Sequence, residues 1–187
     1  MTAGFIDIVG YLFDHFGVLM DIRQLGERDA SAFRALRRMG LLESPEAFAE
    51  STVGFEAKSI EQVADMLSHH GRGDFVLGAF VSNELVGVVG FYTYAHEKMA
   101  HKGTIWGVYV SPSGRSRGIG RSLLRSAVDK ATSIPGLRQL NLTVVVDNAV
   151  AKRLYENEGF KVTGVEAAAL RVNGRYVDEF FMQKALV

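Results

Sequence analysis

Apolar side chains recur at helical spacing in the first third of the chain. Residues 27–42 and 59–70 each present one apolar face at intervals of three and four positions. Ser59 and Gln62 stand three residues apart at the start of the second stretch, as in a capping box. Between the two stretches, residues 44–46 read Ser-Pro-Glu, and proline suits a first helical turn. We therefore expect three helices here, the middle one short.

The following runs are rich in valine, phenylalanine and tyrosine, which favour strands. Residues 75–81 and 84–94 flank Ser82 and Asn83, a pair that suits the tight turn of an antiparallel hairpin. The rest of the pattern predicts helices over 118–132 and 148–158 and strands over 20–25, 105–110, 137–146, 160–170 and 176–182. Neither a repeat nor a linker divides these elements. We expect one α+β domain in three layers, with a mixed central sheet of six or seven strands flanked by helices.

This domain is expected to span residues 20–187, which leaves residues 1–19 as an N-terminal extension. Apolar side chains recur at helical spacing there, although three glycines weaken the helix. The extension has two aspartates and no lysine or arginine, unlike a secretory signal. Two interpretations stay open: a leader upstream of a natural start at Met20, or a helix that packs on its own chain or a sister chain.

Composition removes several classes of function. Twenty-one basic residues balance 21 acidic ones, so no general positive field is available to hold a nucleic acid. Cysteine is absent, which excludes disulfides, thiolate metal sites and cysteine nucleophiles. His69 and His70 are adjacent and point to different faces of a helix, so they make no metal site. No apolar run reaches the roughly 18 residues that cross a bilayer. We expect a cytoplasmic protein with no metal, nucleic-acid or membrane partner.

Residues 108–124 read as a strand end, a glycine-rich loop and a helix start. Gly118 and Gly120 permit a sharp turn and a close approach by a ligand, while the helix start presents free N–H groups. Arginines stand at positions 115, 117, 121 and 125, and no acidic residue lies among these eleven positions. This combination predicts a phosphate site. The spacing fits neither a Walker loop nor a dinucleotide fingerprint, because Arg121 replaces the Walker lysine and Leu123 stands where the fingerprint needs its third glycine.

Two motifs give this loop a closer match. Arg115, Gly118 and Gly120 form the pattern Arg-x-x-Gly-x-Gly behind a Val-x-Val-x-Pro strand end, which resembles the acetyl-coenzyme A (acetyl-CoA) loop of the GNAT N-acetyltransferase superfamily. Residues 148–160 resemble the family's Asn-x-x-Ala-x-x-Leu-Tyr-x-x-x-Gly-Phe signature, in the family's order along the chain. The resemblance covers about residues 20–185. It implies a GNAT fold and an acetyl-CoA-dependent N-acetyltransferase.

The resemblance also implies roles for individual residues. Gly107 inside a strand predicts a bulge, and the resemblance implies that the backbone groups freed there bond the pantetheine arm. Asn148 is expected to contact the same arm and Lys152 to reach a coenzyme phosphate. The cofactor-binding residues expected in this way are Val108, Val110, Arg115, Ser116, Arg117, Gly118, Ile119, Gly120, Arg121, Asn148 and Lys152.

Tyr155 is the one catalytic residue that the resemblance implies, as the general acid for the leaving thiolate. With unperturbed pKa values, a phenol protonates a thiolate uphill by about 1.5 units, or roughly 2 kcal/mol. A tyrosine that only orients the sulfur by a hydrogen bond is therefore an alternative. A tyrosine that only fills the seam between helix and sheet is a third interpretation.

The general base cannot be read from the sequence. Relatives in the family keep a glutamate at two positions where this chain has Thr104 and Thr143. An alkylammonium is less than about 1% neutral at pH 7, so a proton must still be removed. The remaining candidates are a water chain and the side chains of His96, His101, Glu56, Asp178 and Glu179.

We expect direct attack of an amine on acetyl-CoA in a ternary complex, with a small-molecule amine favoured because the two glutamates are missing. The resemblance implies that residues 43–48 and the loop to Lys58 shape the acceptor site, where their acids could attract a cationic amine or simply form a solvated helix face. The alternatives are an acetyltransferase for protein or peptide N-termini, an acetyl-CoA-binding module without activity, and an assembly protein that works through residues 1–19. A homodimer is expected if residues 1–19 pack on a sister chain.

Overall fold

The computed structural model describes residues 11–13, 19–68 and 73–186 of the 187-residue chain. The strands are β1 (Tyr11–Phe13), β2 (Leu19–Gln24), β3 (Phe75–Val81), β4 (Glu84–Thr93), β5 (Lys102–Val110), β6 (Gln139–Val145), β7 (Lys161–Val172) and β8 (Arg175–Ala185). The helices are α1 (Ala30–Glu43), α2 (Thr52–Glu56), α3 (Ile60–Ser68), α4 (Ile119–Thr132) and α5 (Ala149–Asn157), with 3-10 turns at Glu27–Asp29, Pro45–Ala47, Glu97–Met99 and Pro112–Gly114.

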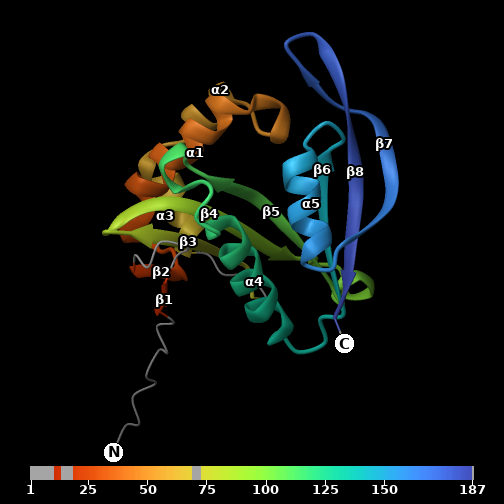
Figure 1. Ribbon diagram of the computed structural model, residues 1–187, viewed down its shortest axis with the longest axis horizontal. Helices are drawn as coiled ribbons and strands as arrows, with labels where there is room; N and C mark the ends of the chain where they lie inside the picture. Colours follow the sequence, from red (N-terminus) through yellow and green to blue (C-terminus); the bar gives the residue numbers. More distant parts are fainter. Residues whose placement is uncertain (1–10, 14–18, 69–72, 187) are drawn as a thin grey trace, which may run out of the picture.

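All the described strands lie in one mixed sheet, in the order β1-β2-β3-β4-β5-β6-β8-β7 (Figure 1). Neighbouring strands are antiparallel except β5 and β6, which are parallel. Strands β2 to β8 supply the expected mixed sheet, and the short β1 extends its edge. The expected α+β fold with a central mixed sheet and flanking helices is confirmed.

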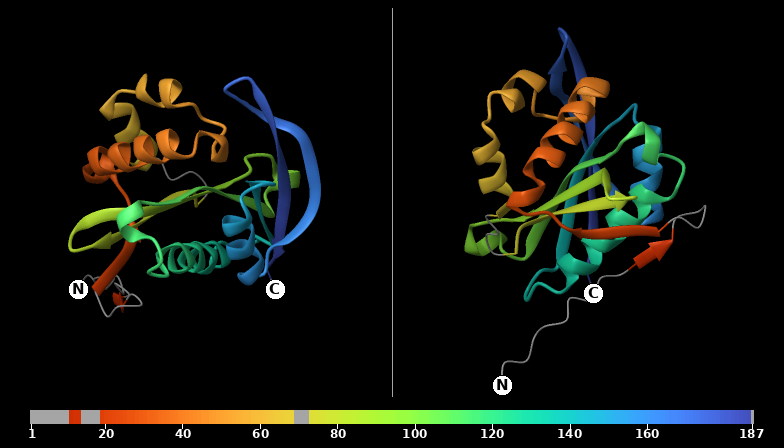
Figure 2. Two further views of the ribbon diagram at one scale, coloured as in Figure 1. Left: turned by 45° about the horizontal axis from the view of Figure 1, so that its top comes forward. Right: turned by 90° about the vertical axis from the view of Figure 1, so that its left-hand side faces the viewer.

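Helices cover both faces of the sheet (Figure 2). Helices α1, α2 and α3 share an apolar cluster with β3 and β4 on one face, built around Phe33, Phe55 and Val88. Helices α4 and α5 share a larger cluster with the other face, built around Leu123 and Phe91. Alternate residues of β3 enter the two clusters, because successive side chains of a strand point to opposite faces.

Local sequence signals set several of these elements. Ser82 and Asn83 both have positive φ, as the two-residue turn between β3 and β4 requires. The amide of Gln62 donates to the Ser59 hydroxyl at 3.3 Å, and the amide of Ser59 donates to the Gln62 side chain at 2.8 Å, so the predicted capping box starts α3. This helix was expected to reach His70, and its last two residues lie outside the described part of the chain.

The expected helix over residues 1–19 is wrong where the structure describes that segment. Residues Tyr11–Phe13 form β1, which pairs antiparallel with the start of β2. The apolar spacing of the segment therefore does not produce a helix at these positions. Its glycines weaken a helix, and pairing with β2 prevails. The rest of the prediction, over residues 1–10 and 14–18, lies outside the described residues. Across the described residues, no helix is long and apolar enough to span a membrane.

Strands β5 and β6 stay paired over only three residues each. Lys102, Gly103 and Thr104 lie opposite residues 139–141, and the described strands have no further partners across this seam. Beyond it, the register between β4 and β5 shifts, so that Val89 alone faces two residues of β5. Gly107 lies at this bulge with φ of +62°, as its place inside a strand predicted. The two strands thus diverge toward their carboxyl ends, and the site described next lies between them.

Candidate active site

The diverging strands border two connected hollows. A narrow slot is lined by Val108 on β5, Val145 on β6, and Asn148 and Tyr155. A wide cavity of about 840 Å3 opens beside it, under the turn that follows α1. Trp106, Gly107 and Thr143 line both hollows, along with Phe48 and a few neighbours. An extended guest in the slot would therefore present its end to the wide cavity.

The slot offers backbone groups to such a guest. Residues of β5 beyond Thr104 have no strand partner on the β6 side in the described chain. At the bulge, Gly107 and Val108 have no register partner on β4, because the ladder passes from the pair Trp106–Gly90 to the pair Tyr109–Val88. A guest that supplies its own amide and carbonyl groups could pair with these strand edges, as an added strand does. The resemblance implies a pantetheine arm along Val108 and Val110; Val108 lines the slot, whereas Val110 pairs with Gly87 on β4 and is not among the slot's lining residues.

Tyr155 lines the slot from α5. Its side chain is 7% exposed and packs edge-on against Phe160, with ring centroids 6.2 Å apart. Burial raises the pKa of Tyr155 well above its ordinary value. The phenol therefore keeps its proton at neutral pH and is a donor rather than a base.

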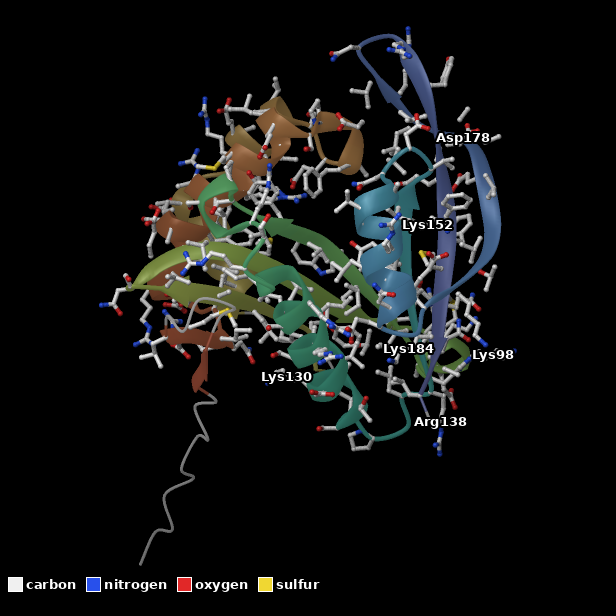
Figure 3. All side chains as sticks on the ribbon, in the orientation of Figure 1. Lys98, Lys130, Arg138, Lys152, Asp178 and Lys184 are labelled. Atoms are coloured by element: carbon white, nitrogen blue, oxygen red, sulfur yellow. The ribbon has the colours of Figure 1, made fainter. Side chains whose placement is uncertain are left out.

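Asn148 and Lys152 occupy the first turns of α5. The side chain of Asn148 accepts a hydrogen bond from the amide of Ala151 at 3.0 Å and caps the helix, while also lining the slot. Lys152 donates to Glu156 at 2.5 Å, one helical turn further on. Figure 3 shows Lys152 on α5. The capping role of Asn148 was not foreseen, although a small polar residue before an apolar run is the usual signal for it.

The glycine-rich loop connects β5 to α4. Ser116 and Gly118 both have positive φ, of +61° and +79°, and α4 begins at Ile119 directly after them. The first amides of a helix have no partner within the helix, so the N–H groups of residues 118–121 are available at this end. A phosphate is the favoured guest for such an end, because the helix dipole is positive there.

Arg115 is held at the surface of this loop by an ion pair with α1. Its guanidinium donates two bonds of 2.6 Å to the carboxylate of Glu43, at the end of α1, and a third of 3.2 Å to the carbonyl of Val110. The Tyr109 hydroxyl donates to the same carboxylate at 2.5 Å. Arg115 and Tyr109 together lower the pKa of Glu43, while burial and Glu43 raise that of Tyr109 to about 12. The bonds of Arg115 use three of the five N–H groups of its guanidinium, so two are left that can reach a phosphate beside the ion pair.

Arg121 and Arg125 also have acidic partners. Both donate to Glu158 at the end of α5, at 2.6 and 2.9 Å, and this carboxylate is only 8% exposed. Burial opposes ionisation of Glu158, but the two guanidinium groups more than offset it, so the pKa of Glu158 is lowered. The loop lacks acids in its own sequence, yet distant acids neutralise much of its charge.

Comparison with known sequences decides the family. The sequence model of the Acetyltransferase (GNAT) family matches residues 37–160, which are 124 of the 187 residues. The chain belongs to the GNAT acetyltransferase family. The GNAT match includes the glycine-rich loop, the bulge and Tyr155, so both hollows lie largely within it. The expectation of a GNAT N-acetyltransferase is confirmed, and enzymes of this family use acetyl-CoA.

Two relatives of known activity are similar over about two thirds of their own length. The L-amino acid N-acetyltransferase AaaT of Escherichia coli is 27% identical over 108 residues, which cover 58% of this chain and 66% of the relative. The spermidine N(1)-acetyltransferase of Vibrio cholerae is 24% identical over 121 residues, which cover 65% of this chain and 70% of the relative. Both names state a small-molecule acceptor.

Solved GNAT structures agree with the fold. A ribosomal-protein-alanine N-acetyltransferase from Brucella melitensis is 27% identical, with a TM-score of 0.77, and the match covers 88% of this chain and 99% of that one. The structure of yncA, a putative acetyltransferase from Salmonella typhimurium with its cofactor acetyl-CoA, is 25% identical, with a TM-score of 0.76 and coverage of 90% and 94%. The GNAT fold implied by the sequence motifs is confirmed.

The structure separates the candidate bases of this GNAT domain. Glu179 on β8 lines the wide cavity beside Thr143. The Asp178 side chain instead accepts a bond from the Ala168 amide at 2.7 Å, on the arm formed by β7 and β8 (Figure 3). Glu56 pairs with Arg38, outside the wide cavity. His96 and His101 line neither hollow. Of the acidic candidates, Glu179 is the one placed at the cavity.

Sequence reasoning missed Arg37 as a residue of the wide cavity, whereas Phe48, Glu50 and Lys58 fall in the segment 43–58 that the resemblance assigned to the acceptor site. Arg37 looked like one more polar position of α1, yet its side chain is only 7% exposed. Lys58 donates to Glu50 at 2.5 Å, and Arg37 contacts the same carboxylate at 3.4 Å. The available signal was spacing: Arg37 follows Phe33 by four positions, which places it on the apolar face of α1. In the described residues, no group of three or more His, Asp and Glu side chains is placed to hold a metal ion.

Proposed function

We propose that this GNAT enzyme transfers the acetyl group of acetyl-CoA to the primary amine of a small molecule, by direct attack in a ternary complex. The observation that carries the proposal is the junction of the two hollows at Trp106, Gly107 and Thr143. A donor bound along the slot and an acceptor bound in the wide cavity meet there, and no covalent carrier is required.

Acetyl-CoA supplies an activated thioester when it is bound. In this proposal the backbone of Val108 and Val110 pairs with the pantetheine arm, and Asn148 borders it. Residues 116–121 present amides to the pyrophosphate, with Arg115, Arg117, Arg121 and Lys152 as sources of positive charge. The amides at the Gly107 bulge would polarise the carbonyl that the amine attacks.

Tyr155 is proposed as the proton donor to the leaving sulfur. Its burial at the slot and its raised pKa keep the phenol protonated. The same shift makes full transfer of the proton harder than the roughly 2 kcal/mol of the unperturbed pair. A hydrogen bond to the developing thiolate is therefore the form of assistance that the environment of Tyr155 supports best.

Glu179 is proposed as the group that takes the proton from the amine. Burial raises the pKa of this carboxyl, with a smaller contribution from Glu166 across the strand pair, while a hydrogen bond from Thr143 opposes the shift. Thr143 stands where relatives in the family keep a glutamate, so the neighbouring strand would supply the missing carboxylate. A raised pKa brings a carboxylate nearer to the pKa of a useful general base.

A small acceptor is favoured over a protein N-terminus. The wide cavity is bordered by α1, the turn after it and β8, and its volume suits a single small molecule. The similarity to an amino-acid and a spermidine acetyltransferase supports this choice. The similarity to a ribosomal-protein-alanine N-acetyltransferase keeps a peptide acceptor as the second candidate. A cytoplasmic location and a homodimer stay predictions.

Calorimetric titration with acetyl-CoA, followed by an amine screen that measures thiol release, tests the proposal. The screen contains amino acids, diamines, polyamines and a short peptide with a free N-terminal alanine. We expect saturable binding and thiol release that depends on a small amine. Binding without amine-dependent release would identify a binding module, and release only with the peptide would identify a protein acetyltransferase.

A further inference from the structure

Arg37 is a buried cation that the proposed reaction has not used. It lies on α1 and lines the wide cavity, with 7% of its side chain exposed. Burial lowers the pKa of Arg37, and Glu50 only partly opposes this effect. In the described part of the chain, its Nη1 atom is buried and has no hydrogen-bond partner. A buried donor without a partner costs free energy, so a ligand that supplies a hydrogen-bond acceptor to Nη1 would be stabilised there.

The existing contacts of Arg37 leave it free to take one. Its guanidinium stacks over the Phe48 ring at 4.4 Å, which fixes its plane but satisfies no N–H group. Its bond to Glu50 through Nη2 is long, at 3.4 Å, and Lys58 already neutralises that carboxylate from 2.5 Å. The guanidinium can therefore turn to a better acceptor in the cavity, and Glu50 keeps its ion pair with Lys58.

Nη1 also lies beside the junction of the two hollows. A Cβ atom placed on Gly107 would be 3.6 Å from it. Gly107 is the bulge residue at which the proposed donor and acceptor meet. A group held by Nη1 would therefore be close to the attacked carbonyl, within the span of a very short molecule.

We propose that Arg37 binds the carboxylate of the acceptor and that the acceptor is an α-amino acid, an inference that rests on the proposed function. A carboxylate matches the planar guanidinium and fills the missing bond of Nη1. In an α-amino acid a single carbon separates the amine from the carboxylate, which suits the short distance between Arg37 and the bulge. A polyamine brings only positive charge to this buried cation and is disfavoured.

Matched sets of acceptors test the carboxylate directly. For several side chains, the kcat/KM of the amino acid is compared with that of its carboxamide, its decarboxylated amine and its β-amino isomer. For the native enzyme we expect the α-amino acid to exceed each of the other three by about 10-fold or more. Amines without a carboxylate that react as well as the amino acid would overturn the assignment.

Substitution of Arg37 tests the residue. Arg37→Met should lower kcat/KM for α-amino acids by about 10- to 100-fold and leave the decarboxylated amines within about threefold. The matched control is Arg38→Met, because Arg38 is the next residue of α1 but pairs with Glu56 outside the cavity. An equal loss for all acceptors would mean that Arg37 only supports the fold. If Arg37→Met does not fold, Arg37→Lys retains the charge and loses the planar fork, and the same selective loss is expected.

Product binding separates this inference from the transfer reaction. Should acetyl-CoA bind and no amine react, the transfer proposal fails, yet the anion site can still be measured. In the presence of coenzyme A, an N-acetyl-amino acid should raise the melting temperature of the native enzyme and not that of Arg37→Met. The matching N-acetylamine should raise neither. Equal shifts with both compounds would reject the carboxylate site.

Discussion

Burial determines the chemistry of the two residues proposed to move protons. Tyr155 on α5 lines the slot, and Glu179 on β8 lines the wide cavity. Low exposure raises both pKa values, which makes the phenol a poorer acid and the carboxylate a better base. The two shifts have unequal consequences, since only the carboxylate can change its protonation within a workable pH range.

Removal of the Tyr155 hydroxyl should slow turnover. We expect Tyr155→Phe to lower kcat by about 100-fold, as for loss of a proton donor, with the acetyl-CoA dissociation constant changed by less than about threefold. Steady-state kinetics and calorimetry check the two values. Tyr176→Phe is the control, because Tyr176 is 68% exposed on β8. Unchanged turnover in Tyr155→Phe would mean that Tyr155 only packs between the helix and the sheet.

Glu179 should produce a pH dependence of known sign. The base must be ionised, so kcat should fall as the pH drops through the pKa of Glu179, which burial places above its usual 4.5. In Glu179→Gln this acid limb should disappear and kcat should fall by about 100-fold. Asp178→Asn is the control, since the Asp178 carboxylate bonds the Ala168 amide. An acid limb that survives in Glu179→Gln would assign the proton to another group.

At the scale of elements, distant acids determine which charges of the glycine-rich loop remain available. Glu43 at the end of α1 stands 72 positions from Arg115, and Glu158 at the end of α5 stands 37 positions from Arg121. Arg115 is 46% exposed and shares Glu43 with Tyr109. Arg125 shares its carboxylate with Arg121, so its loss leaves Glu158 paired.

Coenzyme affinity should distinguish these two arginines. We expect Arg115→Met to weaken acetyl-CoA binding by about 10-fold, which corresponds to one charge-assisted bond to phosphate. Arg125→Met should change it by less than about twofold. Calorimetric titration at one fixed salt concentration gives both values. Equal affinities in the two variants would show that Arg115 serves the contact with α1 rather than the coenzyme.

At the scale of the whole molecule, local signals were enough for most elements and for the loop. The capping box at Ser59, the turn at Ser82 and Asn83 and the bulge at Gly107 each depend on neighbours a few residues away, and the structure bears them out. The place of Arg37 in the cavity and the distant acids that pair with the loop arginines could not be found this way. Their roles arise from contacts between α1, α5 and the sheet, which one sequence does not display.

The three-residue ladder between β5 and β6 has a consequence for cooperativity. It divides the sheet into two blades, β1–β5 and β6–β8, which the apolar cluster under α4 and α5 joins on one side. The buried members of the cluster under α1 to α3 all come from the first blade and its helices, in the described residues. On that side the second blade contacts the Pro45–Ala47 turn instead of a buried apolar cluster, so opening of this blade can precede global unfolding.

A ligand bound along the edges of both β5 and β6 would link the two blades. We expect amide hydrogens of β6 and β8 to exchange faster than those of β3 and β4 in the free protein, and saturating acetyl-CoA to bring the two rates together. Hydrogen exchange read by mass spectrometry measures this difference. Protection confined to the glycine-rich loop would mean that the blades are already one unit. In the expected case, acetyl-CoA is a reactant that also stabilises the pairing of the two halves of the sheet.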